Sequence, residues 1–213
     1  MFEMYLQKLL LNIPPVLLAL TAHECAHAWA AYKLGDPTAK MLGRVSLNPF
    51  RHLDPIGTIA LFLTGMFGWA RPVPINVRNF RNVSQGMMLT AAAGPLANLG
   101  LAGASAFIYK LFAVAAGPYL GRYPAVYNPL FIMIELSIVM NVSLAVFNML
   151  PIPPLDGSRV LSYFLPGRKA LAFSKIEPYG FVILLLLITT GVINMALSPF
   201  VAALTRLLIG GFY

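Results

Sequence analysis

Long apolar runs separated by short polar stretches dominate this chain. Four runs, at residues 9–32, 86–116, 129–149 and 178–205, approach or exceed the about 20 residues that an α-helix needs to cross the hydrocarbon core of a bilayer. A fifth run, residues 55–69, has only about fifteen residues and is typical of a re-entrant or interfacial segment. The pattern predicts an all-α polytopic membrane protein with about four full transmembrane helices plus a short re-entrant or fifth membrane segment.

Two segments between the first two full-length runs have strand character. Residues 43–49 (GRVSLNP) end in a turn, and in residues 71–77 the side chains of Val73, Ile75 and Val77 alternate with others. The prolines of the second segment confine such a strand to a sheet edge. We expect the two segments to pair as a small β-hairpin.

Composition agrees with a membrane environment. Of the 213 residues, 59% are hydrophobic and only 10% are charged, against about 25% charged in an average soluble domain. The net charge of +8 arises from basic residues between the apolar runs, which favours orientation in a lipid bilayer over a nucleic-acid partner. There is no internal repeat or low-complexity linker, so we expect a single domain over residues 1–213.

Basic residues fall unequally on the two sides of this layout if residues 55–69 do not span the membrane. One side carries Lys33, Lys40, Arg44, Arg51, Arg71, Arg78, Arg81, Arg159, Arg168, Lys169 and Lys175. The other side carries only Lys8, Lys110, Arg122 and Arg206. By the positive-inside rule the first side is cytoplasmic and both termini lie outside. The assignment fails if residues 55–69 cross the membrane.

The first apolar run carries an unusual polar group, His23-Glu24-Cys25-Ala26-His27. Residues four apart on an α-helix lie roughly 40° apart in projection, so the two histidines point the same way and can bind one ion, with Glu24 near the same face. This HExxH spacing is typical of zinc peptidases, in which the imidazoles bind the metal and the glutamate activates a zinc-bound water as general base. The alternative is a chance occurrence, but unpaired polar groups are costly in an apolar span, which favours metal binding.

A catalytic zinc needs a third protein ligand. Among the acidic residues other than Glu24, only Glu135 and Asp156 lie in or beside apolar runs. Asp156 is the better candidate, because the prolines before it break the helix and Gly157 permits a turn that brings the carboxylate into the bundle. Its alternative role is an ordinary N-cap for a short helix at residues 158–165. We expect Glu135 to pair with a polar neighbour inside the bundle, with a role in metal access as the alternative.

Together these residues resemble the site-2 protease family of intramembrane zinc metalloproteases. That family combines HExxH in one membrane helix with NxxPxxxxDG near another, and this chain has HECAH at 23–27 and NMLPIPPLDG at 148–157. The intervening AAGPLANL is similar to the family's GPxxN element, which implies that Gly94, Pro95 and Asn98 lie near the site. The resemblance is to a compact, prokaryotic form without an inserted peptide-binding or nucleotide-sensing domain.

The resemblance implies zinc-dependent cleavage of substrate proteins within or next to their transmembrane segments, the activity called regulated intramembrane proteolysis. It implies one Zn2+ per chain, held by His23, His27 and Asp156, with Glu24 as catalytic base. The partners it implies are transmembrane protein substrates in a prokaryotic cell membrane. The active site would lie nearer the cytoplasmic face, because His27 is six residues, or about 9 Å, before Lys33.

Three further residues are candidates for substrate binding or for support of the metal. The resemblance implies that Asn148 hydrogen-bonds the substrate backbone or the attacked carbonyl and that Asn98 supports the site; helix-to-helix hydrogen bonding is the alternative for both. His52 packs at the interface, or approaches the metal as an extra or regulatory ligand. The hairpin expected near the active site pairs with an extended substrate, or only covers the site.

Two other classes of function compete with a protease. An ion transporter also buries acids and histidines, but this chain has neither inverted repeats nor paired broken helices. A catalytically silent metal-binding membrane scaffold would have no need of Glu24. Nothing in the pattern indicates an oligomeric state.

Overall fold

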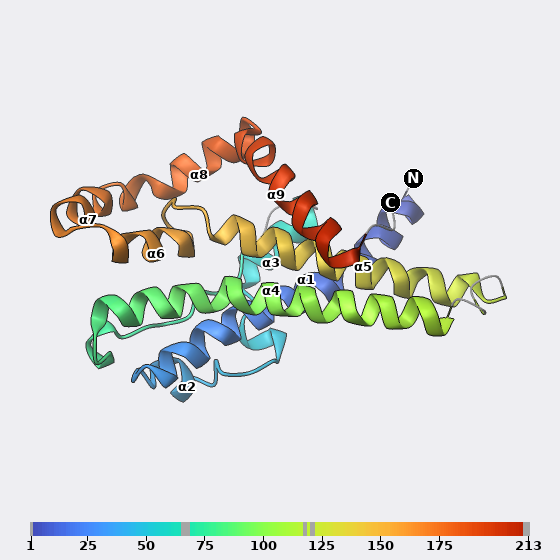
Figure 1. Ribbon diagram of the computed structural model, residues 1–213, viewed down its shortest axis with the longest axis horizontal. Coiled ribbons are helices and arrows are strands. Elements are labelled where there is room, and N and C mark those ends of the chain that lie inside the picture. The colour runs from blue at the N-terminus through green and yellow to red at the C-terminus, as the bar shows by residue number, and fades with distance from the viewer. Residues whose placement is uncertain (1, 65–68, 117–118, 120–121, 211–213) are drawn as a thin grey trace.

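The computed structural model describes residues 2–64, 69–116, 119 and 122–210, and the regular structure within them is helical (Figure 1). Three long helices dominate: α1 (Phe2–Lys33), α4 (Val83–Ala116) and α5 (Pro124–Asn148). The shorter elements are α2 (Thr38–Met41), η1 (Pro49–Arg51), α3 (Pro55–Thr64), η2 (Val77–Asn79), α6 (Asp156–Phe164), α7 (Gly167–Ser174), η4 (Glu177–Tyr179), α8 (Gly180–Thr189) and α9 (Val192–Ile209). The predicted all-α class is confirmed.

Several helical stretches of the described chain are long and apolar enough to cross a membrane, as expected of an integral membrane protein. The five candidates are Leu9–Lys33, Val83–Ala116, Pro124–Asn148, Gly167–Thr189 and Val192–Ile209. The predicted last span over residues 178–205 is not one continuous helix, because Gly191 adopts a left-handed conformation (φ 76°) and separates α8 from α9. The fifth candidate span therefore arises from this break and not from residues 55–69.

The short apolar run forms α3, which begins at Pro55 and ends at Thr64; residues 65–68 of that run lie outside the described residues. Ten helical residues rise about 15 Å, half of the about 30 Å of bilayer hydrocarbon. The described part of α3 is thus too short to cross a membrane by itself, and the re-entrant placement of residues 55–69 stays a prediction.

The predicted β-hairpin is wrong, since no strand occurs in the residues that the structure describes. A single isolated antiparallel bridge joins Leu53 and Ala70. A ladder does not continue from it, because Pro72 and Pro74 lack the N–H group that a ladder needs. In addition, the guanidinium of Arg44 donates to the Pro72 carbonyl (3.3 Å), where a partner strand would have donated.

The long helices run along one axis and pack through small side chains. Figure 1 shows α4 and α5 lying lengthwise beside each other, α9 crossing onto α5, and the two chain termini at the same end of the molecule. Ala102 and Ala106 of α4 meet Ile138 and Val142 of α5 and Ile209 of α9 in a fully buried cluster. Small residues let helix backbones approach closely where the surrounding solvent is lipid.

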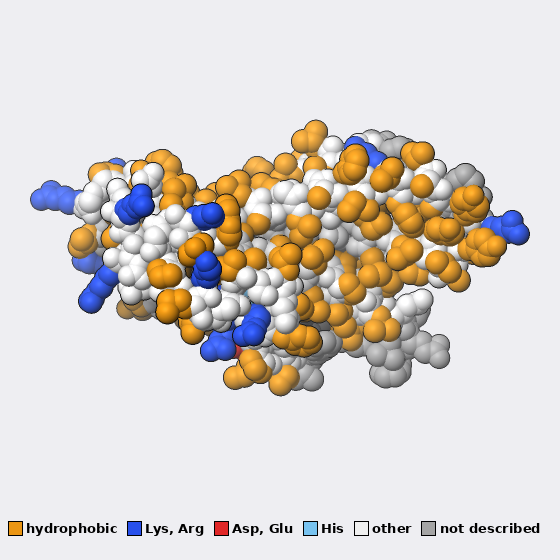
Figure 2. Space-filling model, turned by 90° about the horizontal axis from the view of Figure 1, so that it is seen from below, with side chains coloured by type: hydrophobic (Ala, Val, Ile, Leu, Met, Phe, Trp, Pro, Cys, Tyr) orange, Lys and Arg blue, Asp and Glu red, His pale blue; other side chains and the backbone are white. Residues whose placement is uncertain are grey.

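Apolar side chains cover much of the flank of the molecule, whereas Lys and Arg gather mainly towards the end where α2 and α7 lie (Figure 2). Among the exposed large apolar residues are Phe107, Leu111 and Val114 of α4 and Phe181 and Leu186 of α8. An apolar surface of this extent is unusual in water and is expected where a protein faces lipid.

Candidate metal centre

Two imidazoles from α1 meet inside the helix bundle. His23 and His27 lie one turn apart and are only 5% and 8% exposed. Their Nε2 atoms are 3.0 Å apart. The helical spacing of the motif thus brings two metal-binding atoms to one buried point.

A hydrogen bond at the other ring nitrogen orients each imidazole. The Nδ1 of His23 donates to Asn98 Oδ1 (2.6 Å), and the Nδ1 of His27 donates to the Thr90 carbonyl (2.7 Å), both on α4. A carbonyl oxygen only accepts, so each Nδ1 carries a proton, and in the neutral imidazole each Nε2 then has a free lone pair. This is the tautomer that metal binding through Nε2 requires.

Asp156 brings a third donor atom to the same point. It is the first residue of α6, and its Oδ2 lies 3.2 Å from His23 Nε2 and 3.3 Å from His27 Nε2. Leu155 occupies the N-cap position, so the alternative of an N-cap aspartate is wrong. A Cβ at Gly157 would lie 2.2 Å from a backbone carbonyl oxygen at the end of α5. Only glycine therefore fits where the start of α6 packs against the end of α5.

The three donor atoms have the spacing of a zinc site. A tetrahedral ion with bonds of about 2.0–2.1 Å holds neighbouring donors about 3.3–3.4 Å apart, and the observed separations are 3.0, 3.2 and 3.3 Å. In the described structure Asp156 Oδ2 is buried and accepts no hydrogen bond. Three lone pairs that converge in a buried space repel one another unless a cation lies between them. The residues present therefore fit zinc.

Gly94 allows α4 to approach the two histidines. A Cβ at this position would lie 2.5 Å from His27 Nε2 and 2.6 Å from His23 Cε1. Pro95 and Asn98 follow on the same helix and are buried as well. The structure thus places the GPxxN element directly against the imidazoles.

Glu24 lies near the three donors, and His52 lies near Glu24. Glu24 is half-buried on α1. His52 is 1% exposed; its Nε2 donates to the Ser46 carbonyl (2.8 Å), and its buried Nδ1 has no hydrogen-bond partner in the described residues. It lies outside the group of side chains whose donor atoms converge.

Asn148 is half-buried at the end of α5, and its Nδ2 donates to the Leu144 carbonyl of the same helix (2.9 Å). Its contact with substrate stays a prediction.

Sequence reasoning missed Asn141, which is fully buried and hydrogen-bonded to Asn98 (2.8 Å). A polar residue inside an apolar run was the available signal. The carbonyl of Thr90 carries no such signal, because it belongs to the backbone.

Asp36, just beyond α1, accepts hydrogen bonds from two segments that are far apart in the sequence. It is fully buried and accepts hydrogen bonds from the N–H of Thr38 (3.1 Å), the N–H of Asn76 (2.7 Å) and the side-chain amide of Asn79 (2.8 Å). Burial raises the pKa of Asp36, but these hydrogen bonds outweigh it and leave the pKa below its usual range. The ionised carboxylate therefore joins the end of α1 to the segment before α4.

Comparison with known proteins bears on this site. The sequence model described as "Peptidase family M50" matches residues 121–190, about a third of the chain. A protein of Bacillus subtilis (strain 168) named "Putative zinc metalloprotease YwhC" is 39% identical over 188 residues, which cover 88% of this chain and 84% of that protein. The chain belongs to peptidase family M50, the site-2 proteases.

More distant relatives carry related names. "Putative zinc metalloprotease Rip2" of Mycolicibacterium smegmatis is 26% identical over 197 residues, 89% of this chain and 71% of that protein. "Zinc metalloprotease RasP" of Bacillus licheniformis is 27% identical over 133 residues, 59% of this chain and 32% of that protein. No solved structure matches the chain. Membership of family M50 makes this protein a zinc metalloprotease, in agreement with donor atoms at zinc spacing.

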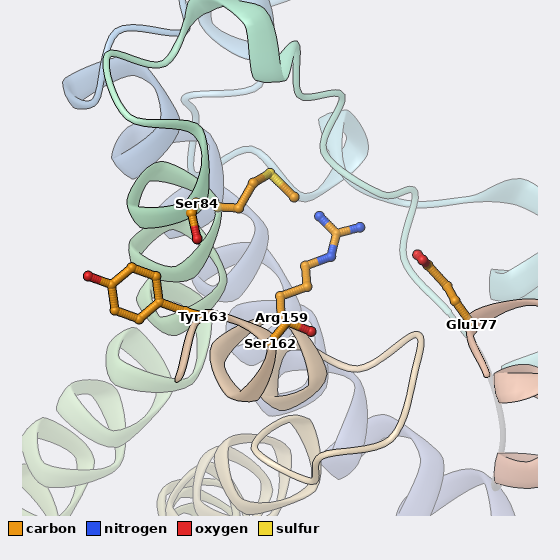
Figure 3. A pocket seen from close by; sticks show the side chains of 6 residues that line it. Ser84, Arg159, Ser162, Tyr163 and Glu177 are labelled. Atoms are coloured by element: carbon orange, nitrogen blue, oxygen red, sulfur yellow. The ribbon is translucent and has the colours of Figure 1, made fainter. Parts of the chain in front are cut away.

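An open pocket of about 240 Å³ lies near this M50 metal centre but is separate from it (Figure 3). Its lining consists of Ser84, Met87, Arg159, Ser162, Tyr163 and Glu177. Arg159 lies one turn after Asp156 on α6, and Figure 3 shows Arg159 and Glu177 extending into the same space. None of the three zinc donors lines this pocket, so it is a surface hollow beside the α6 helix.

Proposed function

We propose that this protein is a zinc-dependent intramembrane endopeptidase that cleaves substrate proteins within or next to their transmembrane segments. His23, His27 and Asp156 hold one Zn2+ per chain, and Glu24 is the general base. The observation that carries this proposal is the convergence of three buried acceptor atoms among helices long enough to cross a membrane.

The protein's own side chains divide the proton transfers between them. Zinc bound at this site supplies a Lewis acid that lowers the pKa of a coordinated water to about 7. Glu24 follows His23 directly and takes the proton of the attacking water, then passes it to the amine of the leaving peptide. The imidazoles keep their protons at Nδ1 for Asn98 and the Thr90 carbonyl, so neither competes with Glu24 as base.

We place the active site nearer the cytoplasmic face of a prokaryotic cell membrane. His27 lies six residues before Lys33, where α1 ends, or about 9 Å along the helix. Lys and Arg gather mainly towards this end of the molecule (Figure 2), and the positive-inside rule assigns such an end to the cytoplasm. The relatives compared above are bacterial, which supports the prokaryotic membrane.

Residues 71–76, which we name the strap, are the proposed place where substrate binds. The Arg71 N–H donates to the His52 carbonyl (2.7 Å) and the Asn76 N–H to Asp36 (2.7 Å), so both ends are anchored. Between these ends, within the described structure, the backbone groups of Val73 and Ile75 make no hydrogen bond. Cleavage requires an unwound substrate, and an extended substrate segment can pair with these free groups.

The test compares wild type with Glu24→Gln on a single-span model substrate in liposomes, with zinc measured on both proteins. We expect both to hold about one zinc per chain and only the wild type to cleave, because the amide keeps the shape of the side chain but cannot accept a proton. Absence of zinc from both would refute the metal site, and equal cleavage would refute the base. If both hold zinc and neither cleaves, the silent scaffold is favoured.

A further inference from the structure

A buried chain of hydrogen bonds runs from the metal centre into the gap between α4 and α5. Asn98 Nδ2 donates to Asn141 Oδ1 (2.8 Å) and to the Ala19 carbonyl of α1 (3.0 Å). Asn141 Nδ2 in turn donates to the Ser137 carbonyl (2.8 Å). Both asparagines are 0% exposed, so neither amide has water as an alternative partner.

We propose that Asn141 is a positioning residue of the metal centre, which holds the amide of Asn98 in the orientation that keeps the Nε2 of His23 free for zinc. The inference rests on the proposed metal site. Asn141 itself is not one of the three donors, and it acts only through Asn98.

The donor-to-acceptor direction of these hydrogen bonds is set at Ser137, the end farthest from the metal centre. The Ser137 carbonyl can only accept, so the NH2 group of Asn141 must face it and the Oδ1 of Asn141 must face Asn98. Asn98 then donates both amide hydrogens, one to Asn141 and one to the Ala19 carbonyl. Its Oδ1 is left to accept from His23 Nδ1, which therefore carries the ring proton.

Loss of the acceptor at residue 141 removes one of the two groups that fix the Asn98 amide. A rotated amide would present its NH2 group to His23 Nδ1, which would then have to accept. The ring proton would move to Nε2 and block the lone pair that binds zinc. Groups that orient a ligating histidine are typically worth about tenfold to a hundredfold in metal affinity.

A purely structural role for Asn141, as a link between α4 and α5, makes a different prediction, and the chain offers a matched control. Ser105 Oγ and Ser137 Oγ form a hydrogen bond (3.0 Å) between the same two helices and are 6% and 7% exposed. Ser137 Oγ also accepts a longer hydrogen bond from Asn141 Nδ2 (3.4 Å), but the Ser137 carbonyl (2.8 Å) is the closer acceptor that orients Asn141. Ser105→Ala therefore removes a buried interhelical bond and leaves the hydrogen bonds from the Ser137 carbonyl through Asn141 and Asn98 to His23 in place.

The experiment measures zinc affinity by chelator competition, and the d–d absorption bands of the Co2+-substituted protein, on purified full-length protein in detergent. We expect Asn141→Leu, of similar volume, to weaken zinc binding by about tenfold to a hundredfold and to shift the Co2+ bands. Asn141→Asp, as a neutral acid, donates to the Ser137 carbonyl and accepts from Asn98, so it should bind within about threefold of wild type. Ser105→Ala should bind as wild type does.

Two results would overturn the inference while the metal site stands. In the first, Asn141→Leu lowers the melting temperature but binds zinc as tightly as wild type. In the second, Ser105→Ala weakens zinc binding as much as Asn141→Leu does. A wild type without zinc would instead refute the proposed function, and the inference with it. If Asn141→Leu does not fold, Asn141→Ser is used with the same expected loss, since its short hydroxyl does not reach Asn98.

Discussion

Gly94 is the point at which α4 meets the two imidazoles, and its replacement by alanine adds one methyl group to the space where the metal binds. The added Cβ would lie 2.5 Å from His27 Nε2 and 2.6 Å from His23 Cε1. Nonpolar contacts require about 3.5 Å, so either the rings or the helix must move by about 1 Å. Zinc sites tolerate deviations of only about 0.2 Å in bond length. We therefore expect Gly94→Ala to lose zinc affinity by more than about a hundredfold, and cleavage with it.

Two glycines of the same helix provide the control. A Cβ at Gly100 or Gly103 meets no atom within 4 Å, so Gly100→Ala and Gly103→Ala should keep wild-type zinc affinity. Glycine to alanine in a helix interior stabilises the helix by roughly 0.5–1 kcal/mol, so lost helicity cannot explain a defect. The assay is zinc content and chelator competition on protein of verified helicity. Wild-type zinc binding by Gly94→Ala would refute the metal site derived from this geometry.

Two further predictions concern the loops around the site. Ile75→Pro removes the strap N–H that would pair with substrate, and it should slow cleavage by about tenfold, the effect of one hydrogen bond, with zinc content unchanged. The control variant Ile75→Val keeps the N–H and should cleave at the wild-type rate. Equal cleavage rates for the two variants would contradict substrate pairing. The pKa of Asp36 is lowered by folding, so its stabilisation is complete above the unfolded value of about 3.9 and is lost as the pH falls through the folded pKa. Asp36→Asn should therefore lower the free energy of unfolding at pH 7 by about 2 kcal/mol, measured as a lower melting temperature. The difference from wild type should be smaller below about pH 4. An equal difference at both pH values would contradict this role of the carboxylate.

Two features of the fold depart from the sequence predictions, and a third was left with two alternatives, for a shared reason. The strap has the alternating side chains of a strand, but its conformation depends on Arg44, which lies far from the strap in the sequence. The guanidinium of Arg44 donates to the Pro72 carbonyl, which a partner strand would otherwise have used. The last apolar run is uniform in hydropathy, and the left-handed conformation of Gly191 divides it. The sequence favours Asp156 as a third donor but leaves an N-cap role as the alternative, and the approach of α6 to α1 brings its carboxylate to the imidazoles. Each outcome depends on contacts that periodicity does not contain.

The sequence by itself determined the helical spans and the pair of imidazoles, because both follow from local rules: length and hydropathy select helices in lipid, and a spacing of four residues puts His23 and His27 on one face. The family resemblance implied that Gly94 and Asn98 lie near the site, but only tertiary structure decided that Gly94 lies against the rings, that Asn98 and Asn141 are hydrogen-bonded to each other and to His23, and that the three donors stand at zinc spacing. Those relations join residues far apart in the chain, and their geometry exists only once α1, α4, α5 and α6 have packed together.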